Sequence, residues 1–235
     1  LDCLNKHKVD FNVLTTVHAA NVDHPIEVYL FLRDVVKTQF IQFIPIVEPI
    51  NQQDTAQEQP VTDRSVDPEK YGQFLIAVFD EWLRRDVGKV FVQIFDVALG
   101  AWMGRPGGLC VFAPTCGRAL AMEHNGDVYA CDHFVAPEYK LGNIMQTPLL
   151  ELAASVDQQQ FGLNKRAKLP HTCQECEVLF ACHGGCPKNR IRTTTAGVPG
   201  LNYLCTGYKA FFQHIDSPLK MMASLLRQSP PSGEY

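Results

Sequence analysis

Eight of the nine cysteines in this 235-residue chain lie between residues 110 and 205, and only Cys3 lies outside that region. A small secreted protein held together by disulfides would explain such crowding, but proteins of that class have little hydrophobic core and carry a secretion signal. This chain is 46% hydrophobic and shows no secretory signal pattern. The cysteines therefore predict metal sites in a protein with a core of its own.

The spacing of these cysteines suits two sites of four. They follow the patterns Cys110-x5-Cys116-x14-Cys131 and Cys173-x2-Cys176-x5-Cys182-x3-Cys186-x18-Cys205. A Cys-x2-Cys pair brings two sulfurs to one centre within a single turn, and the two glycines before Cys186 let the backbone fold closely against that centre. Four thiolates bind either zinc or an iron–sulfur cluster, and spacing alone does not separate these alternatives.

The first 50 residues predict an α/β fold. The apolar run at 11–17 indicates a strand, residues 25–37 indicate a helix with Pro25 in its first turn, and residues 40–47 indicate a second strand. Two strands joined by a helix form a βαβ unit, which places the strands parallel in one sheet. Ligands of such sheets bind beyond the carboxyl ends of the strands.

The remaining chain is expected to contain helices, a hairpin and exposed segments. Asn125-Gly126 is a strong hairpin signal, and the predicted hairpin carries Cys131. Cys3 is expected to be a buried packing residue. The expected elements are an exposed loop at 48–67, a helix at 68–85, an apolar segment at 90–102, a hairpin at 120–131, a helix at 208–227 and a frayed tail at 230–233.

Charge and hydropathy exclude two classes of partner. With 21 basic and 25 acidic residues, the formal net charge is −4, which provides no general attraction for nucleic acid. Lys188, Arg190 and Arg192 form a small basic group without interleaved aromatic residues, so a solvated face is expected there. No apolar run approaches the roughly 20 residues that a membrane helix needs.

Two stretches of the cysteine region, CGRALAMEHNGDVYACDHF and CQECEVLFACHGGCPKNR, resemble the SPASM domain of radical SAM enzymes. Two further stretches, LDCLNKHKVDFNVLTTV and FIQFIPIVEP, resemble the last third of the barrel in the anaerobic sulfatase-maturating enzymes, which include arylsulfatase regulator-like iron–sulfur oxidoreductases. The resemblance implies a partial (β/α) barrel at 1–50, a linker with connecting helices at 51–104, and a SPASM domain with a C-terminal helix at 105–235. Because the chain starts with Leu1 rather than Met, we expect a fragment of a longer protein.

The resemblance also implies specific roles for residues. It assigns one auxiliary [4Fe-4S] cluster to Cys110, Cys116, Cys131 and Cys186, and a second to Cys173, Cys176, Cys182 and Cys205. Asp132 matches the position of a carboxylate that takes the proton from the substrate thiol or hydroxyl, which makes it the candidate general base. From residue type alone, Asp132 is more simply a turn cap or an ion-pair partner of Arg118.

The implied reaction converts a Cys or Ser of an unfolded sulfatase chain to formylglycine, and the enzyme is expected in the cytoplasm. A third cluster would cleave S-adenosylmethionine to a 5′-deoxyadenosyl radical, with electrons from a donor such as a flavodoxin or ferredoxin. That third cluster needs a CxxxCxxC motif, which this chain lacks, so we expect the chain to be inactive by itself. Two alternatives stay open: a SPASM enzyme that modifies another peptide, and a non-enzymatic binding module stabilised by zinc or another metal.

Overall fold

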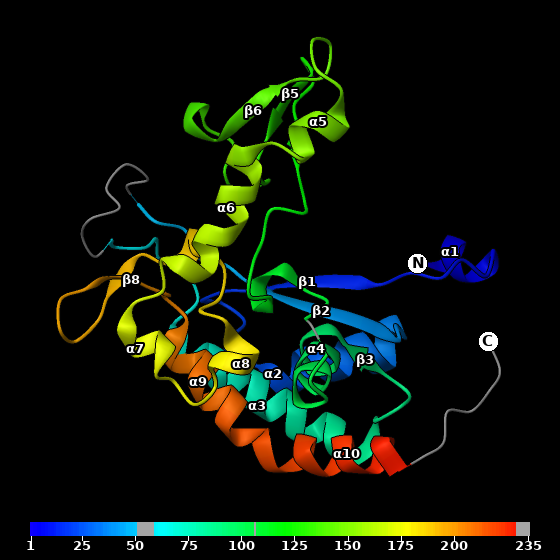
Figure 1. The fold of residues 1–235 in the computed structure, drawn as a ribbon. Coiled ribbons are helices and arrows are strands. Elements are labelled where there is room, and N and C mark those ends of the chain that lie inside the picture. Colours follow the sequence, from blue (N-terminus) through cyan, green and yellow to red (C-terminus); the bar gives the residue numbers. More distant parts are fainter. Residues whose placement is uncertain (51–58, 106, 229–235) are drawn as a thin grey trace. The chain divides into compact units, whose positions relative to one another are not determined.

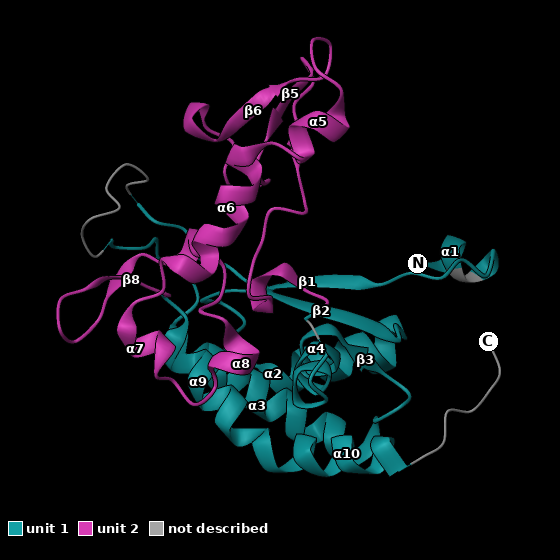
Figure 2. Cartoon of the chain, in the orientation of Figure 1, with its two compact units in different colours: residues 1–54, 59–107, 203–235 teal, residues 55–58, 108–202 magenta. Residues whose placement is uncertain are grey.

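The computed structural model describes residues 1–50, 59–105 and 107–228, which form two compact units (Figure 1 and Figure 2). Unit 1 combines residues 1–54, 59–107 and 203–235, and unit 2 is centred on residues 108–202. The C-terminal segment 203–228 belongs to unit 1, together with the N-terminal part of the chain.

The sheet of unit 1 confirms the predicted βαβ unit. Strands β1 (Val13–Val17), β2 (Phe40–Pro45) and β3 (Phe91–Val92) are parallel and lie in the order β1-β2-β3, with Val13 opposite Ile41. The connecting segment is α2 (Pro25–Leu30) followed by a π-helix, η1 (Phe31–Val36). It ends at Lys37, which has a left-handed backbone with φ of 58°.

Helix α3 (Pro68–Arg85) begins and ends where the sequence predicts. The side chain of Asp67 caps its first turn by accepting hydrogen bonds from the backbone N–H groups of Glu69 (3.0 Å) and Lys70 (2.9 Å). Its apolar face is buried, and Phe79 packs against Trp82, Phe95 and Phe211. The expected apolar segment at 90–102 divides into β3 and α4 (Gln93–Trp102).

The C-terminal region contains two helices where one was predicted. Helix α9 (Cys205–His214) ends before Ile215, and α10 (Asp216–Gln228) follows directly. Pro218 lies in the first turn of α10, where its missing N–H is tolerated, whereas in one continuous helix it would clash with the preceding turn. Phe211 and Phe212 are buried as expected. The predicted tail at 230–233 lies outside the described residues.

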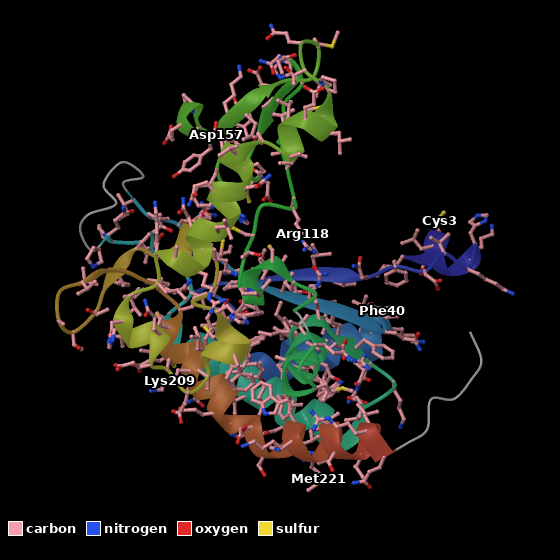
Figure 3. All side chains as sticks on the ribbon, viewed as in Figure 1. Cys3, Phe40, Arg118, Asp157, Lys209 and Met221 are labelled. Atoms are coloured by element: carbon pink, nitrogen blue, oxygen red, sulfur yellow. The ribbon has the colours of Figure 1, made fainter. Side chains whose placement is uncertain are left out.

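Two expectations for unit 1 are wrong. Cys3 lies on the short helix α1 (Asp2–Lys6) and is exposed rather than buried (Figure 3), because the other described side chains of that helix are exposed too. The segment 48–67 is not simply an exposed loop, because Pro49 pairs with Val61 and the side chain of Val66 is fully buried. Residues 51–58 of that segment lie outside the described residues.

Unit 2 consists of short elements between long loops. The predicted hairpin is present as β4 (Ala121–Met122) and β5 (Asp127–Tyr129), and β6 (Lys140–Asn143) adds an unpredicted third antiparallel strand. The other elements are η2 (Cys110–Phe112), η3 (Pro137–Tyr139), α5 (Leu149–Ala153), α6 (Val156–Ala167), α7 (His171–Gln174), α8 (Leu179–Cys182), η4 (Pro187–Asn189), β7 (Arg192–Thr193) and β8 (Pro199–Leu201).

Helix length and hydropathy were compared with the requirements of a bilayer. Within 1–50, 59–105 and 107–228, no helix is both long and apolar enough to cross a membrane.

Candidate metal centre

The first predicted group of cysteines comes from four separate segments of unit 2. Cys110 begins η2, Cys116 precedes a left-handed Gly117, Cys131 lies two residues beyond β5, and Cys186 follows α8. Burial raises the pKa of Cys116, and the thiols of Cys186 and Cys110 add to that effect. Burial also raises the pKa of Cys131 to about 12, with a contribution from Cys186. Cys110 and Cys186 therefore act electrostatically on other thiols of the group.

One polar face of helix α6 binds the loops that contain these cysteines. Gln158, Gly162 and Lys165 recur at i, i+4 and i+7, so they share one side of the helix, and all three are buried. Gln158 Nε2 donates to the backbone carbonyls of Gly117 (2.7 Å) and Ala130 (3.0 Å), next to Cys116 and Cys131. Its Oε1 atom is buried without a hydrogen-bond partner. This helix therefore fixes both cysteine segments through their backbones.

Gly162 allows α6 to approach the cysteine loop closely. A Cβ atom at this position would lie 2.5 Å from the carbonyl oxygen of Cys116. The backbone N–H of Cys116 donates to the carbonyl of Gly162 at 3.3 Å. A side chain here would therefore push Cys116 away from the helix.

Lys165 is a buried cation beside the same loop, with only 1% of its surface exposed. Its Nζ atom donates to the carbonyl oxygens of Cys110 (2.5 Å), Val111 (2.9 Å) and Ala113 (2.5 Å). Burial lowers the pKa of Lys165 to about 8, and the thiols of Cys116, Cys186 and Cys110 counteract that effect. Three acceptors match the three N–H donors of the ammonium form.

The Cys-His-Gly-Gly-Cys segment turns through three consecutive left-handed residues. His183, Gly184 and Gly185 have φ angles of 47°, 70° and 61°. Arg190 supports this turn, because its guanidinium donates to the carbonyls of Gly184 (3.2 Å), His183 (3.4 Å) and Lys165 (2.7 Å). The prediction that Arg190 belongs to a solvated face is therefore wrong, while Lys188 is exposed as expected.

Three of the four cysteines in the second predicted group lie in unit 2. Cys173 lies in α7, Cys176 follows it in a turn, and Cys182 ends α8. The backbone N–H of Cys176 donates to the carbonyl of Cys173 at 3.2 Å, as expected for Cys-x2-Cys. Burial raises the pKa of Cys173, and the thiol of Cys176 contributes. Cys205, the fourth member, is the first residue of α9 in unit 1.

The sulfur spacing bears on the choice of metal. A zinc ion with four Zn–S bonds of about 2.3 Å places its sulfurs about 3.8 Å apart. Among the described residues, the metal-ligating atoms that lie within 4.8 Å of one another in groups of three or more belong to Cys131, Asp132 and His133, and no such group consists of cysteines. A [4Fe-4S] cluster binds each cysteine through a different iron, which spreads the sulfurs farther apart. Four thiolate donors suit a [4Fe-4S] cluster, and the cysteine sulfurs of the described residues do not show the close spacing of a bound zinc ion.

Asp132 lies at the edge of this region with 71% of its side chain exposed. The Cys131 thiol donates to Asp132 Oδ1 at 3.1 Å, and His133 Nδ1 lies 3.4 Å from the same oxygen. The hydrogen bond from Cys131 lowers the pKa of Asp132, and His133 contributes. The alternative pairing with Arg118 is not seen among the described side chains.

Comparison with known proteins identifies the family that this arrangement resembles. Residues 110–177 match the SPASM model, described as an iron–sulfur cluster-binding domain. The chain is 46% identical to the serine-type anaerobic sulfatase-maturating enzyme of Bacteroides thetaiotaomicron over 99% of this chain. The resemblance to the anaerobic sulfatase-maturating enzymes is confirmed. A cysteine-type enzyme of the same family from Clostridium novyi is 32% identical over 95% of the chain.

A solved structure shares the fold. Native anSMEcpe with bound AdoMet and Cp18Cys peptide superposes with a TM-score of 0.81 and 28% identity, covering 96% of this chain and 61% of that one. The chain spans 58% of the length of both the Bacteroides and the Clostridium sulfatase-maturating enzymes. The α/β fold with a SPASM domain, as the sequence predicts, is therefore confirmed.

Two residues that organise this centre were not predicted from the sequence. Gln158 and Lys165 act through backbone carbonyls that lie 28 to 55 positions away along the chain. The sequence around them predicts only a helix with polar residues on one face. Such a face is usually exposed to solvent, so the pattern does not indicate that these two residues are buried.

Proposed function

We propose that this chain is part of a radical SAM oxidoreductase that converts a Cys or Ser of a sulfatase to formylglycine. The observation that carries this proposal is the similarity to serine-type and cysteine-type sulfatase-maturating enzymes over nearly the whole chain. A neighbouring structure with the same fold contains AdoMet and a peptide, which supports a peptide substrate.

The first auxiliary [4Fe-4S] cluster is assigned to Cys110, Cys116, Cys131 and Cys186. The electrostatic coupling among these four thiols and their anchoring by α6 support the assignment. The second cluster is assigned to Cys173, Cys176, Cys182 and Cys205. When bound, such clusters provide sites that can take up the electron released as the substrate is oxidised.

Asp132 is assigned as the general base, because its carboxylate is exposed beside the first group of cysteines. Oxidation of a Ser side chain to the aldehyde removes a hydrogen atom from the β-carbon, a proton from the hydroxyl group and one electron. Asp132 would accept the proton. For a Cys substrate the same three losses give a thioaldehyde, which water converts to the aldehyde with release of hydrogen sulfide.

The remaining parts of the system are assigned to other segments and partners. The third cluster and S-adenosylmethionine would bind to a CxxxCxxC segment that this chain does not contain, so the chain alone should release no 5′-deoxyadenosine. A flavodoxin or ferredoxin would supply electrons, and the reaction would take place in the cytoplasm.

Iron and sulfide analysis tests the metal assignment. After anaerobic reconstitution, we expect about eight iron and eight sulfide per chain, as two [4Fe-4S] clusters require. One or two zinc ions without sulfide would contradict the assignment and favour the binding module. Activity is tested in the longer protein that includes CxxxCxxC, by mass spectrometry of a sulfatase peptide; a modified product other than formylglycine would favour another SPASM enzyme.

A further inference from the structure

Arg190 occupies an unusual position for a charged side chain, because it is half-buried against the cysteine-bearing turn of unit 2. Its guanidinium donates to three backbone carbonyls, of which Gly184 and His183 belong to the Cys182–Cys186 turn. A Cβ atom on Gly184 would lie 3.0 Å from an Arg190 nitrogen, so the turn packs directly on the guanidinium. Arginine stays protonated in proteins, so this position carries a permanent positive charge.

The charges that act on Arg190 come from both predicted groups of cysteines. Burial lowers the pKa of Arg190, and the thiols of Cys173, Cys186, Cys116 and Cys182 raise it. Cys173 and Cys182 belong to the second group, while Cys186 and Cys116 belong to the first. The carbonyls of His183 and Gly184 that the guanidinium contacts lie between Cys182 of the second group and Cys186 of the first, so its charge lies beside a ligand of each group.

Lys165 differs from Arg190 in this respect. Lys165 Nζ contacts the carbonyls of Cys110, Val111 and Ala113, which belong to the loop that starts at a cysteine of the first group, and the thiols of Cys116, Cys186 and Cys110 counteract the effect of burial on its pKa. Arg190 also contacts the residue that carries the other cation, because its guanidinium donates to the backbone carbonyl of Lys165 at 2.7 Å. Lys165 therefore holds a loop of the first group, whereas Arg190 holds the turn between Cys182 of the second group and Cys186 of the first.

We propose that Lys165 and Arg190 set the reduction potentials of the auxiliary clusters, Lys165 for the first cluster and Arg190 for both. This proposal rests on the assignment of the two groups as cluster ligands. Adding an electron to a cluster makes its charge more negative by one, so a nearby buried cation favours the reduced form and raises the potential. Both residues act through the clusters and are positioning residues rather than catalytic ones.

Redox titration of the anaerobically reconstituted chain tests the proposal. Electron paramagnetic resonance is recorded while dithionite reduces the clusters in the presence of mediators. The test variants are Lys165→Gln and Arg190→Gln, which remove the charge but keep N–H donors. The control is Lys168→Gln, which removes an exposed positive charge from the residue that ends the same helix.

Lys165→Gln is expected to lower the equilibrium constant for reduction at least tenfold in one cluster, equivalent to about 59 mV for one electron. Arg190→Gln is expected to lower it in both clusters, and Lys168→Gln in neither. Unchanged potentials in Arg190→Gln, or a shift in one cluster only, would overturn the shared role of Arg190. An unchanged first cluster in Lys165→Gln would overturn the role of Lys165.

Charge-conserving variants cover the case in which the glutamine variants fail to assemble clusters. Lys165→Arg and Arg190→Lys should then retain both clusters with potentials close to the original, since each keeps the positive charge. Loss of clusters in these variants as well would show that hydrogen-bond geometry, rather than charge, is what matters, and would overturn the proposal. A wild-type chain that binds no iron would instead contradict the ligand assignment itself.

Discussion

At the scale of single residues, the centre depends on side chains that donate hydrogen bonds to backbone carbonyls instead of binding a metal. Gln158 bridges the carbonyls of Gly117 and Ala130, and Lys165 gathers the carbonyls of the loop that starts at Cys110. Polar groups buried in this way are costly to leave without partners. Each such residue therefore stabilises a particular arrangement of the cysteines, although none of them touches a metal.

Replacing Gln158 tests this role. In Gln158→Leu, the carbonyls of Gly117 and Ala130 lose a donor, and we expect a loss of about 1–3 kcal/mol in the free energy of unfolding. Removal of the unpartnered Oε1 atom offsets part of that loss. Urea denaturation of the reconstituted chain measures the change. The neighbouring exposed residue provides the matched control, because Gln159→Leu should leave stability nearly unaltered; equal losses in the two variants would contradict the bridging role.

Asp132 is tested in the longer protein that includes the CxxxCxxC segment. Asp132→Asn keeps the size of the side chain but removes its ability to accept a proton, so formylglycine formation should fall by at least about 100-fold. Cleavage of S-adenosylmethionine does not need this base and should continue. Chromatography of 5′-deoxyadenosine and mass spectrometry of the peptide measure the two steps separately. Undiminished peptide product would exclude Asp132 as the base.

At the scale of elements, close packing of α3 and α9 fixes the start of the helix that contains Cys205. A Cβ atom on Gly72 would lie 2.6 Å from the Cα of Gly207, so these helices cross with their backbones in contact. Such an approach excludes any side chain at the crossing. The position of α9 within unit 1 therefore depends on two glycines.

Gly207→Ala should force these helices apart and cost roughly 1–3 kcal/mol. Gly100→Ala in α4 is the matched control, because a Cβ there meets no atom within 4 Å, and it should stabilise the helix by about 0.5–1 kcal/mol. Thermal denaturation followed by circular dichroism distinguishes the two changes by their opposite signs. A stabilised Gly207→Ala protein would show that the helices separate without cost.

The hairpin in unit 2 should contribute to acid sensitivity. Lys140 donates to Asp127 at 2.7 Å and, together with Asn143, lowers the pKa of Asp127. Because the folded-state pKa lies below the unfolded value of about 3.8, the contribution is present above pH 3.8 and disappears as the pH falls through the folded-state pKa. Asp127→Asn should therefore lower the melting temperature at pH 7 but have little effect near pH 2. An equal decrease at both pH values would argue against the ion pair.

At the scale of the whole molecule, the two proposed ligand sets interleave along the chain, because Cys186 of the first set follows three members of the second. A cluster in either set would therefore restrain segments that also carry ligands of the other. With both proposed clusters bound, this arrangement would make the cysteine region one cooperative system.

Removing iron from the reconstituted chain with a chelator and an oxidant should loosen both sets together. Hydrogen exchange is expected to accelerate in residues 110–131 and 173–186, which contain seven of the eight assigned ligands. The β1–β2 pairing in unit 1 serves as the internal control and should keep its protection. Acceleration confined to one of the two segments would show that the sets are independent.

The sequence by itself determined the features that depend on local chemistry. The alternation of strand and helix predicted the parallel β1–β2 pair, the apolar periodicity at 68–85 predicted α3, and Asn125-Gly126 marked the hairpin. Cysteine spacing indicated a metal-binding region, and motif resemblance indicated the family. Pro218 also carried a readable signal for the break between α9 and α10, which the single-helix prediction did not use.

Only the tertiary structure decided which side chains surround the cysteines. Gln158, Lys165 and Arg190 act on backbone carbonyls, which every residue possesses, so no local pattern of side chains identifies their partners. The same reason explains why Arg190 reads as part of a solvated basic group until the turn at 183–185 folds around it. Hydrogen bonds between distant segments become visible only when the chain is folded, and here they determine the environment of the predicted clusters.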